Sequence, residues 1–329
     1  MRGIIHSLLL WVYVMASTTG IVAEAHEGPE HDIQELTEAM KATGETADLL
    51  LQRAIEYRVL GKMSEALRDL EEASRMDIGT LPVPRELAKV QFSTGKTNEA
   101  IDTLTKVIHA KSAMTSEHAN LLMIRSGFYQ ARSDFKKAIE DSNQAIALYE
   151  TNPEWYLQRS ALHLAANLPK ERMAGIQAGI EKTGAGVLDV EKIDALIDAK
   201  NFTNAIPLIE KELNSSRIRS SWLIRRAKAQ LGLQHKELAI ADLKEALEEI
   251  QPRIHSAAPD VSLLLDRALI HELLGEKEPA RSSYELARDA GAEAWVKEKI
   301  KQLKTEIDAE RSPAPPKKPK EASAEKETK

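Results

Sequence analysis

Apolar residues recur every three or four positions along most of this chain, which is the spacing of helices that bury one face. Short polar turns, such as Leu60-Gly61-Lys62 and Thr94-Gly95-Lys96, separate successive helices. These two turns align at a shift of 34 residues (95 − 61), and Ala66 and Ala100 follow them at the same distance. The pattern predicts an all-α protein built from repeated pairs of antiparallel helices.

An alanine marks the second helix of each predicted pair. The series is Ala66, Ala100, Ala138, Ala174, Ala205, Ala239 and Ala280, with steps of 34, 38, 36, 31, 34 and 41 residues. The longer steps before the third and the seventh pair predict extended turns, and Pro252 and Pro259 lie in the second of these. In the fourth pair, Pro169 indicates a lengthened turn between the two helices.

The repeat resembles the tetratricopeptide repeat, a pair of antiparallel helices with small residues at repeat positions 8, 20 and 27 and a large one at position 24. Five repeats match these positions well, and they begin at Ala47, Leu81, Ala119, Ser220 and Val261. The fourth and fifth repeats are degenerate, and Glu212 stands at position 27 of the fifth. The resemblance implies a right-handed α-solenoid of about seven repeats over residues 47–292, because one pair cannot bury its apolar face alone.

A solenoid needs a cap at each end. We expect residues 26–46 to form a polar leader and an N-terminal capping helix with Ile33, Leu36 and Met40 on its apolar face. Residues 293–309 predict a C-terminal capping helix with Trp295, Ile300 and Leu303. The Pro/Lys-rich tail over residues 310–329 lacks the apolar residues needed for order, so we expect it to be disordered.

An arginine recurs at repeat position 7, in Arg53, Arg125, Arg159, Arg226 and Arg267. A row of arginines can bind anions, but three of these repeats also carry an aspartate 16 residues later, namely Asp69, Asp141 and Asp242. Repeat two lacks both residues. An internal ion pair between the two helices of one repeat is therefore the favoured interpretation. Arg159 and Arg267 have no such aspartate, so their role stays open.

In tetratricopeptide proteins, positions 2, 5, 9, 12 and 13 of the first helix usually line a concave binding face. Carried over to the first three repeats, these positions give an apolar strip edged by three cations: Leu51, Ile55, Arg58, Val59, Arg85, Lys89, Phe92 and Met123. Such a strip suits a peptide with hydrophobic anchors and an acidic flank. The alternative is that some of these residues pack between neighbouring helices. Later repeats offer a more acidic and mixed surface, with Glu154, Leu157, Asp194, Asp198, Lys228 and Glu272.

Composition narrows the function classes. The 329-residue chain is 43% hydrophobic and 29% charged, and its formal net charge of −6 gives no electrostatic case for a nucleic-acid partner. It contains no cysteine, which rules out disulfides and thiol catalysis. Because the sequence also lacks a phosphate-binding loop, a nucleophile elbow and a zinc-protease motif, we expect neither an enzyme nor a cofactor.

The first residues are typical of a signal peptide over residues 1–25. Arg2 precedes an apolar run centred on residues 8–15, and Ala23-Glu24-Ala25 is an A-x-A cleavage site. The run is too short to span a membrane reliably, so we expect no stable membrane insertion after cleavage, although an uncleaved anchor is an alternative. The chain is therefore expected in the periplasm or outside the cell.

The main functional hypothesis is a scaffold or adaptor that binds a protein or peptide on the concave surface. One alternative is copper handling through the mature leader, in which His26 and His31 are weak candidate ligands. Another is an accessory subunit of an exported enzyme complex. No metal site is expected in the repeats themselves.

Removal of the signal peptide has a direct test. We expect N-terminal sequencing of the protein recovered from its native host to begin at His26, because cleavage follows Ala25. Sequencing that begins at Met1 in a membrane fraction would support the uncleaved anchor instead.

Overall fold

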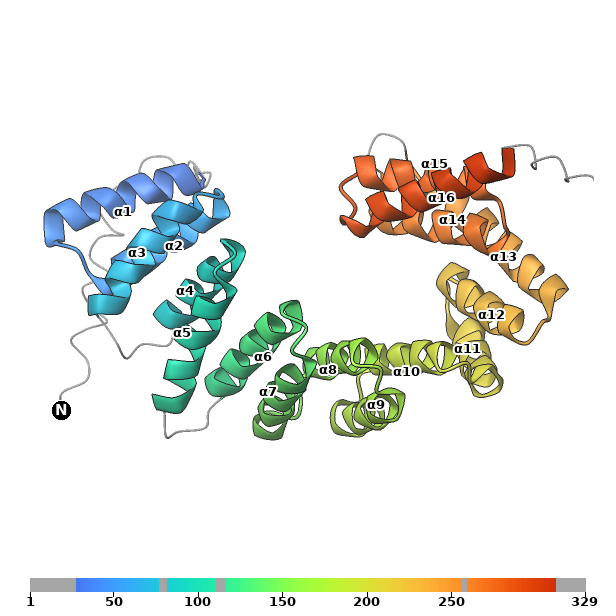
Figure 1. Ribbon diagram of the computed structural model, residues 1–329, viewed down its shortest axis with the longest axis horizontal. Helices are drawn as coiled ribbons and strands as arrows, with labels where there is room; N and C mark the ends of the chain where they lie inside the picture. Colours follow the sequence, from blue (N-terminus) through green and yellow to red (C-terminus); the bar gives the residue numbers. More distant parts are fainter. Residues whose placement is uncertain (1–27, 77–81, 111–115, 256–258, 312–329) are drawn as a thin grey trace, which may run out of the picture. The chain divides into compact units, whose positions relative to one another are not determined.

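The computed structural model describes residues 28–76, 82–110, 116–255 and 259–311. In this part of the chain the regular structure is entirely helical (Figure 1). The α-helices are α1 Pro29–Thr43, α2 Ala47–Val59, α3 Met63–Met76, α4 Pro82–Ser93, α5 Thr97–Ala110, α6 Ser116–Ala131, α7 Phe135–Leu148, α8 Pro153–Ala165, α9 Pro169–Thr183, α10 Gly186–Asp198, α11 Phe202–Ser215, α12 Ser220–Gly232, α13 Lys236–Ile250, α14 Val261–Leu273, α15 Lys277–Asp289 and α16 Trp295–Arg311. A short 3₁₀ helix, η1, covers Gln251–Arg253. The predicted signal peptide, His26 and most of the tail lie outside the described residues.

The chain forms two compact units, the first ending at Ala166 and the second beginning at Asn167. Within each unit, helices pack mainly on their neighbours in sequence, as α2 does on α3 and α12 on α13. The helices alternate between the first helix of a repeat, here called helix A, and the second, helix B. The predicted fold class, an all-α solenoid of tetratricopeptide-type pairs, is confirmed.

The predicted small residues lie where the helices touch. Ala66, Ala100, Ala138, Ala205, Ala239 and Ala280 are all fully buried. A small side chain at this position lets two helix axes approach closely, and large residues fill the space on either side. In the third repeat, the hydroxyl of Ser126 on helix A donates a hydrogen bond to the carbonyl oxygen of Ala138 on helix B, 2.7 Å away.

The fourth repeat departs from the prediction. Ala174 is exposed, and the buried residues of α9 are Arg172, Ile176 and Gly179. Counted from Pro153, these three residues occupy repeat positions 20, 24 and 27, so Arg172 takes the place that alanine holds elsewhere. The alanine series led to the wrong residue because it assumed a small side chain at every position 20.

The turn between helices A and B has the same geometry in all seven repeats. Its position-15 residue has a positive φ in each case: Gly61 (72°), Gly95 (81°), Ser133 (59°), Asn167 (55°), Lys200 (57°), Gln234 (66°) and Gly275 (79°). Since Asn167 occupies this place in the fourth repeat, the expected lengthened turn at Pro169 is wrong. Pro169 instead begins α9, where a proline costs no helical hydrogen bond.

The extended turns predicted between repeats are only partly described. The one before the seventh repeat contains η1, which includes Pro252. Much of the one before the third repeat lies at residues 111–115, outside the described residues.

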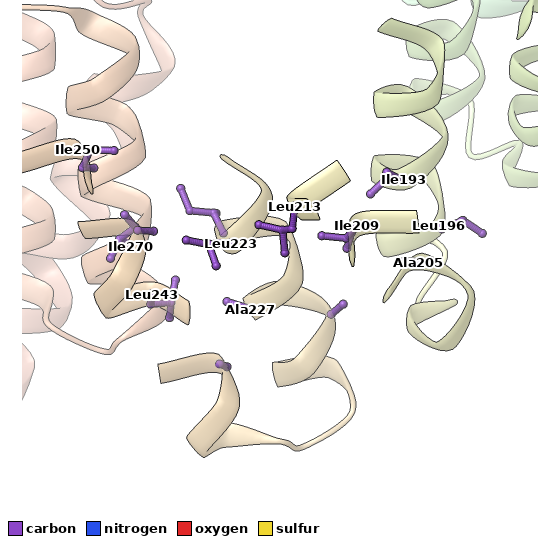
Figure 2. Packing of buried hydrophobic residues seen from close by; sticks show 14 of the residues in the cluster. Ile193, Leu196, Ala205, Ile209, Leu213, Leu223, Ala227, Leu243, Ile250 and Ile270 are labelled. Carbon is purple, nitrogen blue, oxygen red and sulfur yellow. The ribbon is translucent and has the colours of Figure 1, made fainter. Parts of the chain in front are cut away.

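Each unit has its own apolar core. In the second unit the largest core runs from α10 to α14, and in Figure 2 Leu223 of α12 lies between Leu213 of α11 and Leu243 of α13. The first unit has one core over α1 to α4 and another over α4 to α7. α1 contributes the buried Met40 to the first of these, and α16 buries Val296, Leu303 and Ile307 at the other end of the chain.

The internal ion pairs predicted for the arginine row are confirmed, and each has bidentate geometry. The Nε and Nη2 atoms donate to the two carboxylate oxygens at 2.7 and 3.0 Å in Arg53–Asp69, 2.8 and 2.7 Å in Arg125–Asp141, and 2.9 and 2.7 Å in Arg226–Asp242. The three aspartates are buried. The paired aspartate raises the pKa of each arginine and burial lowers it. The effect of the aspartate is the larger, so the pKa of all three arginines is raised.

The same guanidinium groups also connect successive repeats. Nη1 of Arg53 donates to the hydroxyl of Thr37 in α1, and Nη1 of Arg125 donates to Thr105 in α5. Arg159, whose role the sequence left open, donates in the same way to Asn143 in α7. Each acceptor lies in the helix B, or the capping helix, that precedes the arginine's own repeat. Arg53 and Arg125 therefore fix both their own hairpin and its stacking on the preceding helix.

The other open case, Arg267, pairs within its own repeat. Its Nε donates to the hydroxyl of Ser283 at 3.0 Å, and Ser283 stands 16 residues later, where the other repeats have aspartate. Without a carboxylate partner, burial lowers the pKa of Arg267.

The buried arginine pairs yield a stability prediction. We expect Arg125→Met to lower the free energy of unfolding by about 3–5 kcal/mol, because it leaves the Asp141 carboxylate buried without its counter-charge. Urea unfolding of the mature chain, followed by circular dichroism, measures the change. The double variant Arg125→Met/Asp141→Leu removes both charges and should recover most of the loss. An unfolding curve unchanged by Arg125→Met would show that the arginine is not a structural tie.

The turns yield a second prediction, with the opposite sign. Lys200 has a left-handed backbone that a Cβ atom disfavours, so we expect Lys200→Gly to raise the free energy of unfolding by about 0.5–1 kcal/mol. Gly61→Ala should lower it by about 1 kcal/mol. A Cβ at Gly61 would meet no atom within 4 Å, so this cost comes from the backbone alone. Thermal unfolding compares both variants with Lys200→Ala, which should gain nothing.

Candidate functional site

The structure divides the predicted binding strip of the first three repeats. Leu51 is only 9% exposed and packs in the core over α1 to α4, and Met123 is 4% exposed in the next core. These two side chains are thus structural, which corrects the expectation that they contact a ligand. Both stand at repeat position 5, which in these repeats points between the helices.

The other apolar positions of the strip are accessible to different degrees. Val59 is 60% exposed at the end of α2. Phe92 is partly buried, and its ring stacks on Phe128 of α6 with the centroids 4.5 Å apart. Ile55 lines an open depression of about 450 Å³ between α1 and α2. Only Val59 therefore presents most of its side chain to a partner.

The three cations of the strip gather around one buried carboxylate, Glu86, which is 5% exposed. Lys89 Nζ lies 2.9 Å and Arg85 Nε 3.2 Å from its Oε1 atom. Arg58 Nε reaches across from α2 to within 3.6 Å of its Oε2 atom. We call Arg58, Arg85, Lys89 and Glu86 the cationic cluster. It carries three positive charges and one negative charge, so it remains positive by two.

Burial acts to raise the pKa of Glu86, but Lys89 and Arg85 oppose it, and the pKa lies below its usual value. The carboxylate therefore stays ionised and holds the cations in place. About a third of each cationic side chain is exposed, at 37% for Arg58, 32% for Arg85 and 39% for Lys89. Each has N–H donors beyond those that face Glu86. The cluster can therefore accept a further anionic group.

The second unit contains a pocket of about 470 Å³ on the helix A face of three successive repeats. Its charged residues come from α9, α10, α12 and α14, and we call it the charged pocket. These residues are Arg172, Glu191, Asp194, Asp198, Arg225, Lys228 and Asp266. Ser221 and three apolar side chains, Ile197, Ile224 and Leu269, complete the lining.

Two arginines in the charged pocket are held by internal pairs. Arg172 is 5% exposed and donates to Glu191 and to Asp198, at 2.7 Å each. Arg225 makes a bidentate pair with Asp194 at 2.8 and 2.9 Å. Burial lowers the pKa of Arg172, but its two carboxylates outweigh that effect and the pKa is raised.

The other two charged residues of the pocket, Lys228 and Asp266, are not held by internal pairs of this kind. Neither makes a hydrogen bond or an ion pair to another residue in the part of the chain that the structure describes. Burial raises the pKa of Asp266, while Arg225 and Lys228 act against this from a distance.

Four charged residues of these two sites were not predicted from the sequence, and their shared repeat position explains why. The concave-face rule included positions 5, 9, 12 and 13, and it did find Asp194, Asp198 and Lys228. It omitted position 6, which holds Glu86 in α4, Glu191 in α10, Arg225 in α12 and Asp266 in α14. Charged residues at position 6 in four repeats were the available signal. The structure shows that position 6 points toward the preceding repeat, as the pairs Arg225–Asp194 and Glu86–Arg58 demonstrate.

Other predicted features stay as predictions. No group of three or more potential metal ligands occurs among the described residues. His31 contacts Glu35 one turn along α1 at 3.2 Å, while His26 lies outside the described residues, so the copper alternative is untested. Within the described ranges, no helix is long and apolar enough to cross a membrane.

Comparison with known proteins identifies the fold. No family model matches the sequence, and no curated protein matches it. A solved tetratricopeptide repeat protein from Parabacteroides merdae ATCC 43184 is similar in structure, with a TM-score of 0.57 and 16% identity over 83% of this chain and 99% of that one. At this level of identity the similarity shows the fold alone.

Two other solved structures are more distant. The Cut9–Hcn1 hetero-tetramer of the APC/C has a TM-score of 0.49 and 16% identity, over 84% of this chain and 46% of that one. YrrB, described as a TPR protein with an unusual peptide-binding site, has a TM-score of 0.38 and 15% identity, over 67% and 94%.

Proposed function

We propose that this chain is an exported scaffold that binds a partner protein or peptide on the helix A face of its first unit. The observation that carries the proposal is the cationic cluster. The buried carboxylate of Glu86 positions three cationic side chains from two successive helices A. The N–H groups of these cations that do not face Glu86 make no hydrogen bond to another side chain in the described part of the chain.

The chemistry of this face defines the partner. The cluster keeps a net charge of +2 on a chain whose overall charge is −6, so it is a local positive site on a negative molecule. Carboxylates of a partner can bind there by charge-assisted hydrogen bonds. Val59, 60% exposed at the end of α2, supplies an apolar contact beside them. A segment with an apolar residue next to acidic ones fits both features.

The proposed binding face belongs to a rigid scaffold. The arginine pairs and the buried alanines hold successive helices A in a defined arrangement, so the binding face is ordered before the partner arrives. Pre-organisation of this kind reduces the entropy cost of association. Electrostatic attraction to an acidic segment also raises the association rate, and salt weakens it.

Peptide display against the mature chain tests this function. We expect selected peptides to combine Asp or Glu with a neighbouring large apolar residue, and Lys89→Gln to weaken their binding by about tenfold, as loss of one charge-assisted hydrogen bond implies. Fluorescence anisotropy with a labelled selected peptide measures the affinity, which should also fall as salt rises.

The matched control is Lys106→Gln, which removes the same charge from the exposed part of α5, a helix B of the same unit. It should leave the affinity unchanged. Circular dichroism confirms that both variants fold. Selected peptides without acidic residues, or equal losses in the two variants, would refute the role of the cationic cluster.

A further inference from the structure

The charged pocket of the second unit has a chemistry opposite to that of the cationic cluster. Four carboxylates and three cations line it, so its net charge is −1 when all seven groups are ionised. Arg172 already shares two carboxylates, and Arg225 is matched by one. The excess negative charge therefore lies with Glu191 and Asp198, which share one arginine, while Lys228 and Asp266 balance each other in charge.

Acceptor atoms remain available on two sides of the pocket. Asp198 of α10 accepts from Arg172 through Oδ2, and half of its side chain (48%) is exposed. Asp266 of α14 has no hydrogen bond or ion pair to a described residue. A partly buried carboxylate without a partner is unfavourable, and a bound cation would remove that cost.

The rest of the lining fits the stem of a long basic side chain. Ile197, Ile224 and Leu269 give the pocket apolar walls from three helices. A volume of about 470 Å³ lies within the range of natural ligand pockets. Arginine and lysine carry their charge on an apolar stem, which packs against such walls while the head group meets the carboxylates.

We propose that the charged pocket binds a basic side chain, arginine or lysine, presented by a partner polypeptide. Its guanidinium or ammonium group donates to Asp266, and its stem packs on Ile197, Ile224 and Leu269, while the half-exposed Asp198 adds negative charge to the same lining. Arg172 and Arg225 have a positioning role, because they hold the neighbouring carboxylates in place. This extends the proposed function to the second unit, and the two sites can fail separately because they use different residues and opposite charges.

Substitution of Lys228 distinguishes a cationic ligand from an anionic one. This lysine is the pocket's remaining cation without a partner among the described residues, and it stands near Asp266. If the pocket bound a carboxylate, Lys228 would be its main contact. For a basic ligand Lys228 is a repulsive neighbour instead. Removal of its charge should therefore have opposite effects on the two kinds of ligand.

Methyl NMR of the full mature chain provides the test. The isoleucine δ1-methyl groups of Ile197 and Ile224 report on the pocket, and those of Ile55 and Ile101 report on the first unit. The probe is N-acetyl-Ala-Arg-Ala-amide, compared with the same peptide carrying citrulline, lysine or glutamate. We expect the arginine and lysine peptides to shift the two pocket methyl groups in the millimolar range, and the citrulline peptide to have little effect.

Two variants make the result specific. Asp266→Asn keeps the shape of the side chain and should weaken arginine-peptide binding by at least about tenfold, as expected for a charge-assisted hydrogen bond. Lys228→Met should strengthen it about twofold or more. Lys89→Gln, in the cationic cluster of the first unit, is the matched control and should change nothing at Ile197 and Ile224.

Three results would overturn the proposal. The first is equal binding of the citrulline and arginine peptides, because the charge would then be irrelevant. The second is preferential binding of the glutamate peptide that Lys228→Met abolishes, which would identify an anion site. The third is tight binding of free spermidine without binding of either basic peptide, which would identify a small-molecule pocket. Failure of any kind here leaves the peptide-display test of the first unit unaffected.

Discussion

Close approach of helices at the small residues is the constraint on which the rest of this structure depends. Ala66, Ala138 and Ala239 are fully buried because a larger side chain there would push the two helices of a hairpin apart. With the helices this close, the large residues beside the alanines fill the remaining space, and the turns must reverse the chain within a few residues. The positive φ at position 15 of every repeat is the backbone consequence.

The fourth repeat shows what happens when this constraint is relaxed. Arg172 replaces the alanine at position 20, and its guanidinium is buried. It extends toward Glu191 and Asp198 of the next helix A and becomes a wall of the charged pocket. A departure from the repeat pattern thus contributes a buried charge to the lining of the charged pocket.

Neighbouring residues of helix A have separate tasks. At position 7, Arg125 points toward helix B of its own repeat, where it pairs with Asp141. It also donates a hydrogen bond to Thr105 in helix B of the preceding repeat, so it stabilises the packing of one repeat on the next. At position 6, one residue earlier, Glu86 and Arg225 point toward the helix A of the preceding repeat. A rotation of about 100° per residue along the helix separates the two directions. Ion pairs within a hairpin and ion pairs between successive helices A therefore come from residues adjacent in sequence but pointing in different directions.

The sequence by itself determined the helical hairpins, six of the seven predicted alanines and the arginine–aspartate pairs, because these follow from helix periodicity and fixed spacing within one repeat. It did not determine that Leu51 and Met123 are buried, that Arg172 replaces an alanine, or that Glu86 gathers three cations. Those outcomes depend on how consecutive repeats stack, which sets what each side chain meets in the preceding repeat. Periodicity describes one hairpin, whereas contacts between hairpins exist only in the tertiary structure.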